Sequence, residues 1–177
     1  MNISLIVSVI GPDRPGLVEQ LSATVASAGG NWEGSRMMQL SEQFAGMVQV
    51  VLPAERESEL RNALGHLETE DFKVSVIHAG ESEREAAPSS QRILLEVVGQ
   101  DRHGIVAAIS QTLAGLGVNV VELATDCRNA PWSGDKVFQT NAVLEIPDES
   151  DLLLDRLREQ IEEIAGDLMV EIKPEIS

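Results

Sequence analysis

Apolar and polar residues alternate at the start of the chain. Over residues 3–10 apolar side chains recur at every second position, with serines at positions 4 and 8, which is the period of a half-buried β-strand. The alternating apolar positions are Ile3, Leu5, Val7 and Val9. After the turn GPDRPG at residues 11–16, the apolar spacing becomes helical, and we expect a helix that opens near Pro15 and stops at Gly29 and Gly30. The helical apolar positions are Leu17, Leu21, Val25 and Ala28.

The following segment predicts two strands, a helix and a last strand. Residues 31–40 and 44–53 are extended segments joined by the short turn SEQ. Residues 55–67 form an amphipathic helix that begins with acidic residues, and FKVSVIHA at 72–79 is a strand. The order of elements in this half of the chain is therefore βαββαβ.

The pattern then occurs a second time. The turn GQDRHG at residues 99–104 repeats GPDRPG with an offset of 88 positions (99 minus 11). Other identities at this offset are Ser22 with Ser110, Thr24 with Thr112, Gly29 with Gly117 and Asn31 with Asn119. Phe44 and Pro53 match Phe138 and Pro147 at an offset of 94 (138 minus 44), so the second copy carries an insertion around residues 129–136, which includes Trp132. Internal repetition of this kind indicates a duplicated structural unit.

The second copy predicts the same order of elements. They are strand 92–99, a helix from about 103 to 116, strands 118–126 and 136–146, a helix from about 149 to 164 and strand 168–174. Residues 81–91 are charged and then rich in Pro and Ser, which predicts a linker between domains at 1–80 and 92–177. Each domain is expected to be an α+β ferredoxin-like unit, with a four-stranded antiparallel sheet and two helices on one face.

Such a unit leaves one face and the edges of its sheet to be covered. An uncovered apolar sheet face or edge tends to associate with another surface. We therefore expect the two copies to pack against each other or two chains to associate as a homodimer.

The acidic composition narrows the classes of partner. With 13 basic and 29 acidic residues the formal charge is -16, which argues against direct binding of nucleic acid, because that binding depends on clustered Lys and Arg. No apolar run approaches the roughly 20 residues that a membrane helix needs, and the apolar start lacks a basic leader. The single cysteine, Cys127, excludes an internal disulfide. We expect a cytoplasmic protein that does not enter a membrane.

Sequence signals of catalysis and metal binding are missing. The chain contains no GxSxG, no Walker loop and no GxGxxG after a strand. The three histidines, His66, His78 and His103, have no metal-ligand spacing to one another or to Cys127. We therefore expect no enzymatic activity, no cofactor and no metal site.

The two GxDRxGxV segments, at 11–18 and 99–106, resemble the ACT domain of amino-acid-responsive regulators. Each closes a predicted strand and opens a helix, and each is followed by Asn at the start of the next strand. Two such domains in tandem, with no catalytic domain, resemble the family of the glycine cleavage system transcriptional repressor. The resemblance implies a regulatory protein that senses a small amino acid, glycine or serine, and modulates a protein partner, either a transcription regulator or a metabolic enzyme.

The resemblance also implies a ligand site between the first turn and helix of one domain and the second strand of a neighbour. The candidate ligand-binding residues are Gly11, Asp13 and Asn31 in the first copy and Gly99, Asp101 and Asn119 in the second. A glycine allows close approach of the backbone, the N–H groups of a first helical turn favour a carboxylate, and an Asn amide both donates and accepts.

Structural roles for the turn residues stand beside this interpretation. The two aspartates can cap their helices or accept from a ligand ammonium group, and Gly16 and Gly104 can serve close packing of helix and strand. Arg14 and Arg102 can pair with neighbouring carboxylates at the surface. The alternative function is therefore a ligand-free protein interaction module. An RNA-recognition domain has the same order of elements, but the scarcity of aromatic residues and the negative charge argue against it.

Overall fold

The computed structural model describes residues 1–80, 90–129, 134–147 and 151–175. The chain divides into two compact units, Met1–Ser82 and Glu83–Ser177, which we call unit 1 and unit 2. In the described part of the chain, no helix has the length and apolar character needed to cross a membrane.

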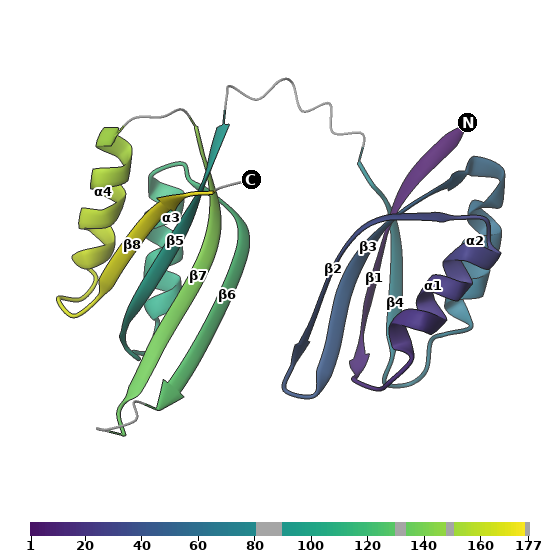
Figure 1. Ribbon diagram of the computed structural model, residues 1–177, viewed down its shortest axis with the longest axis horizontal. Coiled ribbons are helices and arrows are strands. Elements are labelled where there is room, and N and C mark those ends of the chain that lie inside the picture. Colours follow the sequence, from purple (N-terminus) through teal and green to yellow (C-terminus); the bar gives the residue numbers. More distant parts are fainter. Residues whose placement is uncertain (81–89, 130–133, 148–150, 176–177) are drawn as a thin grey trace. The chain divides into compact units, whose positions relative to one another are not determined.

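Unit 1 is a four-stranded antiparallel sheet with both of its α-helices on one face (Figure 1). Its elements are β1 (Asn2–Pro12), α1 (Leu17–Ser27), β2 (Asn31–Leu40), β3 (Gln43–Pro53), the 3-10 turn η1 (Ala54–Arg56), α2 (Glu57–Gly65) and β4 (Lys73–His78). The strand order is β2-β3-β1-β4, so β1 and β3 lie in the centre and β2 and β4 form the edges. The βαββαβ order predicted from the sequence is confirmed in this unit.

Unit 2 has the same architecture. Its elements are β5 (Ser90–Gln100), α3 (Ile105–Gly115), β6 (Asn119–Asn129), β7 (Lys136–Pro147), α4 (Asp151–Glu162) and β8 (Met169–Pro174), with strand order β6-β7-β5-β8. The pairing register is also repeated: Gly11 lies opposite Phe44 in unit 1, and Gly99 lies opposite Phe138 in unit 2. The chain is therefore an α+β protein of two tandem ferredoxin-like units.

The edge strands carry equivalent irregularities. A β-bulge interrupts the pairing of β2 between Trp32 and Gly34, and another interrupts β6 between Val120 and Glu122, which is the same place in the repeat. The insertion of the second copy falls between β6 and β7, where residues 130–133, including Trp132, lie outside the described residues.

Each unit has its own hydrophobic core between the sheet and its helices. In unit 1 the buried positions of β1 are Leu5, Val7 and Val9, which contact α1 and α2 through residues such as Leu21 and Leu60. In unit 2 the equivalent positions of β5 are Ile93, Leu95 and Val97. Burial of each such side chain stabilises the fold by about 1.5–3 kcal/mol. Alternation along the strands thus directs the apolar side chains toward the helices, as the sequence pattern predicts.

Several element boundaries differ from those expected. Strand β5 begins at Ser90, where Ser90 and Gln91 pair with Pro147 and Ile146, so the last two residues of the predicted linker extend the sheet. The turn between β2 and β3 is a two-residue turn, in which Ser41 and Glu42 both have positive φ (49° and 66°). The predicted helix at 55–67 begins with the 3-10 turn η1, and α2 covers only Glu57–Gly65.

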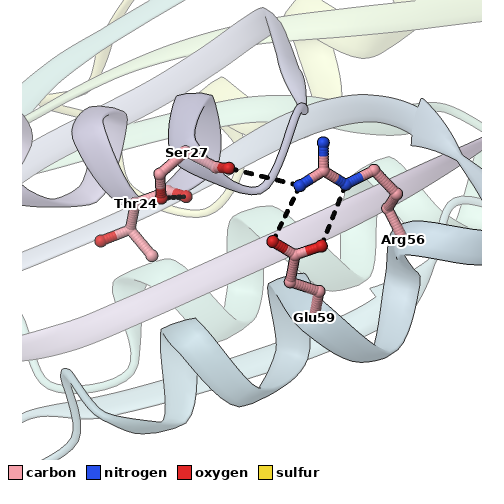
Figure 2. A network of polar contacts seen from close by, with 4 residues as sticks. All are labelled: Thr24, Ser27, Arg56 and Glu59. Atoms are coloured by element: carbon pink, nitrogen blue, oxygen red, sulfur yellow. Dashed lines mark hydrogen bonds and ion pairs between the residues drawn. The ribbon is translucent and has the colours of Figure 1, made fainter.

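The C-terminal end of α1 is held against the start of α2 by an arginine. Arg56 Nε and Nη2 donate to the two carboxylate oxygens of Glu59 at 3.0 and 2.8 Å, and Nη2 also approaches the backbone carbonyl of Ser27 at 3.5 Å (Figure 2). The side-chain hydrogen bond to Arg56 lowers the pKa of Glu59. Gly29 lies beside this arginine with φ of 73°, and a Cβ there would be 2.7 Å from Arg56 Nη1. The guanidinium thus places positive charge at the negative end of the helix dipole.

Candidate functional site

The turn between β1 and α1 is hydrogen-bonded to the β2–β3 hairpin, at the end where the hairpin turns. The backbone N–H of Asp13 donates to the carbonyl oxygen of Glu42 at 2.9 Å. The side-chain amide of Gln39, on β2, donates to Asp13 Oδ2 at 2.7 Å. One carboxylate oxygen of Asp13 therefore binds the edge strand, and the turn that carries the GxDRxG motif is fixed by both backbone and side chain.

Helix α1 begins after Gly16, which adopts a left-handed conformation (φ 91°, ψ -3°). No side chain caps this helix, so the predicted capping by Asp13 is wrong, as is the predicted helix start near Pro15. Asp13 lies too far before Leu17 to reach the first helical turn, because Gly16 occupies the N-cap position. The predicted packing role of Gly16 is also wrong, since a Cβ at this position would meet nothing within 4 Å. The glycine is needed for its positive φ.

Unit 2 builds the same turn. The backbone N–H of Asp101 donates to the carbonyl of Lys136 at 2.9 Å, and α3 begins after a left-handed Gly104 (φ 82°). No side chain caps α3, so capping by Asp101 and packing by Gly104 are equally wrong. Ile105, as the first residue of α3, is equivalent to Leu17.

Cys127 in unit 2 stands where unit 1 has Gln39. Both residues lie opposite a phenylalanine of the neighbouring strand, Phe138 and Phe44. Cys127 is exposed, and its thiol lies beside the carboxylate of Asp101; desolvation of the thiol, followed by the negative charge of Asp101, raises the pKa of the Cys127 thiol. The aspartate of the turn therefore contacts the edge strand in both units, through an amide in one and a thiol in the other.

Gly11 and Gly99 sit where another segment crosses the end of the central strand. A Cβ on Gly11 would be 2.7 Å from Phe72 Cδ2 and 2.8 Å from the Asp71 carbonyl oxygen. A Cβ on Gly99 would be 2.5 Å from Leu168 Cδ2. These glycines allow close approach of the loop that leads into the last strand of each unit, which gives them a structural role in the absence of any ligand.

Asn31 and Asn119 lie at the opposite end of their sheets from the turns. Asn31 is opposite Val51 on β3, whereas Gly11 is opposite Phe44 on the same strand. Seven residues separate these two positions of β3 (51 minus 44), which at about 3.3 Å per residue places them roughly 23 Å apart. The same separation occurs in unit 2, where Asn119 is opposite Glu145 and Gly99 opposite Phe138. Each unit therefore groups its glycine and aspartate and leaves its own asparagine remote from them.

The arginines of the two turns differ. Arg102 pairs with Asp167, in the loop before β8, and Asp167 Oδ2 accepts from the backbone N–H of Gln100 at 2.8 Å. The Gln100 N–H, followed by the Arg102 guanidinium, lowers the pKa of Asp167. The predicted carboxylate pairing is confirmed for Arg102. For Arg14 it is not seen, since its Nη2 lies 3.4 Å from the amide oxygen of Gln20.

Sequence reasoning missed Gln39 and Cys127 as contacts of the turn. The offset of 88 positions pairs them (127 minus 39), but one is a glutamine and the other a cysteine, so they are not among the identities that reveal the repeat. The strand pattern does contain a signal for Gln39. It stands two positions before the predicted hairpin turn, and in an antiparallel sheet this end of the hairpin lies beside the end of the first strand, where the GxDRxG turn begins.

The turn offers backbone donors to an anion. The N–H groups of residues in the first helical turn have no partner within the helix. In α1 and α3 no side chain occupies the cap, and the helix dipole favours negative charge there. In α3 the first of these N–H groups, that of Ile105, already donates to the carbonyl oxygen of Arg102 at 3.3 Å. The geometry is suited to a carboxylate, and the aspartate beside it is suited to a cationic group. Among the described residues, no group of three His, Cys, Asp or Glu side chains could hold a metal ion.

Comparison with known proteins agrees with this architecture. A model of the ACT domain matches residues 4–76. A solved structure of a protein of unknown function from Galdieria sulphuraria is 30% identical, with a TM-score of 0.81 over 99% of this chain and 100% of that one. A candidate glycine cleavage system transcriptional repressor has a TM-score of 0.68 at 14% identity, over 98% of this chain and 99% of that one, and so shares the fold. No curated protein matches the chain. The family match covers residues 4–76, and unit 2 repeats the turn, register and topology of unit 1, so the chain consists of two ACT-like units in tandem.

Proposed function

We propose that the chain is a regulatory protein that binds a small amino acid, with glycine and serine as the first candidates, and modulates a protein partner. The observation that supports this most directly is the pair of uncapped helix N-termini, α1 and α3, each behind a left-handed glycine and beside a fixed aspartate. An amino acid carries a carboxylate and an ammonium group on one carbon, which matches adjacent N–H donors and a carboxylate acceptor.

In this proposal Gly11, Asp13, Gly99 and Asp101 belong to the turns that receive the ligand. Asn31 and Asn119 contribute to a ligand only at a turn of a domain other than their own, because each lies roughly 23 Å from the turn of its own unit. Both asparagines are exposed at the first position of an edge strand, where an amide can reach a neighbouring surface.

The partner and cellular role follow from charge and from the family. Transcriptional control of glycine cleavage is the role suggested by the candidate repressor that shares this tandem fold. With a charge of -16, we propose that control runs through a protein, a transcription regulator or a metabolic enzyme, in the cytoplasm. We propose no catalytic role, since the carboxylates of both turns are engaged with the edge strands and the thiol of Cys127 has a raised pKa.

A second candidate function is a ligand-free protein interaction module. The contacts of Gly11, Gly99 and Asp13 are explained within their own units, because the glycines allow close packing and Asp13 accepts from Gln39. If these contacts fully explain the motif, the turns have only a structural role and bind no ligand.

Thermal unfolding of the full chain with a panel of amino acids separates the two functions. A sensor should be stabilised by about 2.7 kcal/mol at roughly 100 times the dissociation constant of its ligand. Glycinamide, which lacks the carboxylate of glycine, is the matched probe and should give no stabilisation. Asn31→Ala and Asn119→Ala should abolish the gain while leaving the melting temperature of the unliganded chain almost unchanged, since both side chains are exposed. If no amino acid moves the melting curve, the interaction-module function is supported instead.

A further inference from the structure

The sheet of unit 1 has an outer face that points away from α1 and α2 (Figure 1). It is formed by the even-numbered residues of β1 and, after the bulge, of β2, and by the odd-numbered residues of β3 and β4. We call these positions the outer face of unit 1. Its large exposed apolar side chains are Ile10, Met38, Leu40, Met47 and Ile77. Each has more than half of its surface exposed, which is unusual for five large apolar residues on one sheet face.

No paired position on this face carries an acidic residue. The chain has 29 acidic residues, yet the ionised side chains among these positions are only Arg36 on β2 and Lys73 on β4. The remaining positions are apolar, amide, hydroxyl or glycine. Within the strands β1 to β4 the only acidic residue is Glu33, which lies in the bulge of β2 and has no partner on β3.

Unit 2 provides an internal comparison, because it has the same strands in the same register. Its outer face carries five carboxylates, which are Glu96, Glu122, Asp126, Glu145 and Glu171. The equivalent residues in unit 1 are Ser8, Gly34, Met38, Val51 and Ser75. The fold thus tolerates acidic residues at these positions, so their absence from unit 1 is not a requirement of the sheet itself. A sheet face that remains in contact with water usually carries charged side chains, whereas an apolar face indicates a contact.

We propose that the outer face of unit 1 binds the same face of a second copy of this chain. Two chains of charge -16 repel each other, and a contact is least opposed where neither presents a carboxylate. The exposed apolar residues lie on all four strands, which also suits a two-fold interface, in which one patch must complement itself. This proposal is independent of amino-acid binding, because the turn residues Gly11, Asp13 and Gly16 take no part in it.

The size of the face fits a reversible dimer. Four strands about 4.8 Å apart, each with about seven residues at about 3.3 Å, span roughly 19 by 23 Å. Two facing copies would bury on the order of 900 Å² in projection, close to the roughly 1,000 Å² that a specific interface needs. We expect a dimer with a dissociation constant on the order of micromolar.

Charged substitutions on matched positions test the proposal. Met47→Glu places a carboxylate in the centre of the face, and Met38→Asp introduces the residue type that unit 2 has at the equivalent Asp126. Asn141→Glu is the control, because Asn141 occupies in unit 2 the position of Met47 and the change adds the same charge. Met47 and Met38 are each 56% exposed, so both variants should fold, which circular dichroism and thermal melting would verify.

Sedimentation velocity of the full chain, without added amino acids, measures the outcome. The wild-type chain should dimerise between about 1 µM and 0.5 mM, Met47→Glu and Met38→Asp should each weaken the dimer at least about tenfold, and Asn141→Glu should change it less than about twofold. A wild-type chain that stays monomeric over this range overturns the proposal. So does a dimer that survives both methionine variants, or one that Asn141→Glu weakens as much as Met47→Glu does.

Discussion

At the scale of single residues, Asp13 shows why an aspartate before a helix is not always its cap. A capping side chain must stand at the residue that immediately precedes the first turn. Here that position is Gly16, whose positive φ turns the chain into α1, and Asp13 is directed to Gln39 on the edge strand instead. The replacement of Gln39 by Cys127 in unit 2 keeps a donor at the same place, so contact with the aspartate is preserved while its chemistry differs.

Gly11 offers a direct test of whether the first glycine of the motif serves packing or a ligand. Gly11→Ala would bring a Cβ within 2.8 Å of the Asp71 carbonyl oxygen and 2.9 Å of Phe72 Cα, both backbone atoms that cannot move aside cheaply. We expect the free energy of unfolding of the unliganded protein to fall by about 1–3 kcal/mol, as for other overpacked sites. Chemical denaturation without any amino acid measures this.

Gly65→Ala is the matched control in the same unit. Gly65 ends α2, and a Cβ there would meet nothing within 4 Å. The substitution should be neutral or stabilise by about 0.5–1 kcal/mol, because alanine has the higher helix propensity. If Gly11→Ala leaves the free energy of unfolding unchanged, the packing role is contradicted, and ligand binding remains as the explanation for this glycine.

At the scale of elements, the sequence predicts the strands and helices well because their apolar periods differ. The buried positions Leu5, Val7 and Val9 on β1 and Leu17, Leu21 and Val25 on α1 are those that the two periods select. The start of each helix was less predictable. It depends on the left-handed conformation of Gly16 and Gly104, and backbone angles leave no trace in the apolar spacing.

The position of the asparagines follows from the connection between elements. A helix after β1 carries the chain back along the sheet, and the eleven residues of α1 span about 17 Å at 1.5 Å each. Strand β2 therefore starts at the end of the sheet remote from the turn, which separates Asn31 from Gly11. The contact between Asp13 and Gln39 depends on the pairing register of β2 and β3, which a single sequence specifies only weakly.

The loop before β8 gives an element-scale prediction about pH. The Gln100 N–H and the Arg102 guanidinium lower the pKa of Asp167 below its ordinary value of 3.8. A carboxyl group with a lowered pKa in the folded state stabilises the protein above its unfolded pKa, and this stabilisation is lost as the pH falls through the folded pKa. The melting temperatures of the wild type and Asp167→Asn should therefore differ most near about pH 7 and converge below about pH 3.

Thermal melts across this pH range measure the difference. Arg102→Gln is a useful second variant, because it removes the ion pair but leaves the Gln100 N–H bond to Asp167. It should retain part of the pH-dependent stabilisation. A difference between the wild type and Asp167→Asn that is the same at every pH would show that the pair contributes through packing alone.

At the scale of the whole molecule, one framework occurs twice with different surfaces. The register, the bulge and the glycine turn are shared, whereas the outer faces differ in charge. The turns differ as well, because Arg102 is paired with Asp167 while Arg14 approaches only the Gln20 amide. The two copies therefore differ in their surfaces and not in their framework.

The charge of the whole chain also bears on whether it can bind nucleic acid. Several of its 13 basic residues already contact carboxylates of the chain, which reduces the number that could replace counterions on a phosphate backbone. These paired cations are Arg56, Arg61, Arg102, Arg128 and Lys173. The two cations of the outer face of unit 1, Arg36 and Lys73, lie on opposite edge strands and do not form a continuous basic track.

We therefore expect the isolated chain not to bind duplex DNA at physiological ionic strength, so that any effect on transcription requires a partner protein. A protein that contacts 6–10 phosphates loses roughly 10³–10⁵ in affinity between about 50 and 200 mM salt, so even a weak phosphate contribution is detectable as a salt dependence. Fluorescence anisotropy of a labelled duplex titrated with the chain, at low and at physiological salt, measures this. Adding the candidate amino acid to the same titration excludes a DNA-binding state that depends on ligand. Saturable, salt-sensitive binding by the chain alone would contradict the expectation and would place the protein directly on DNA.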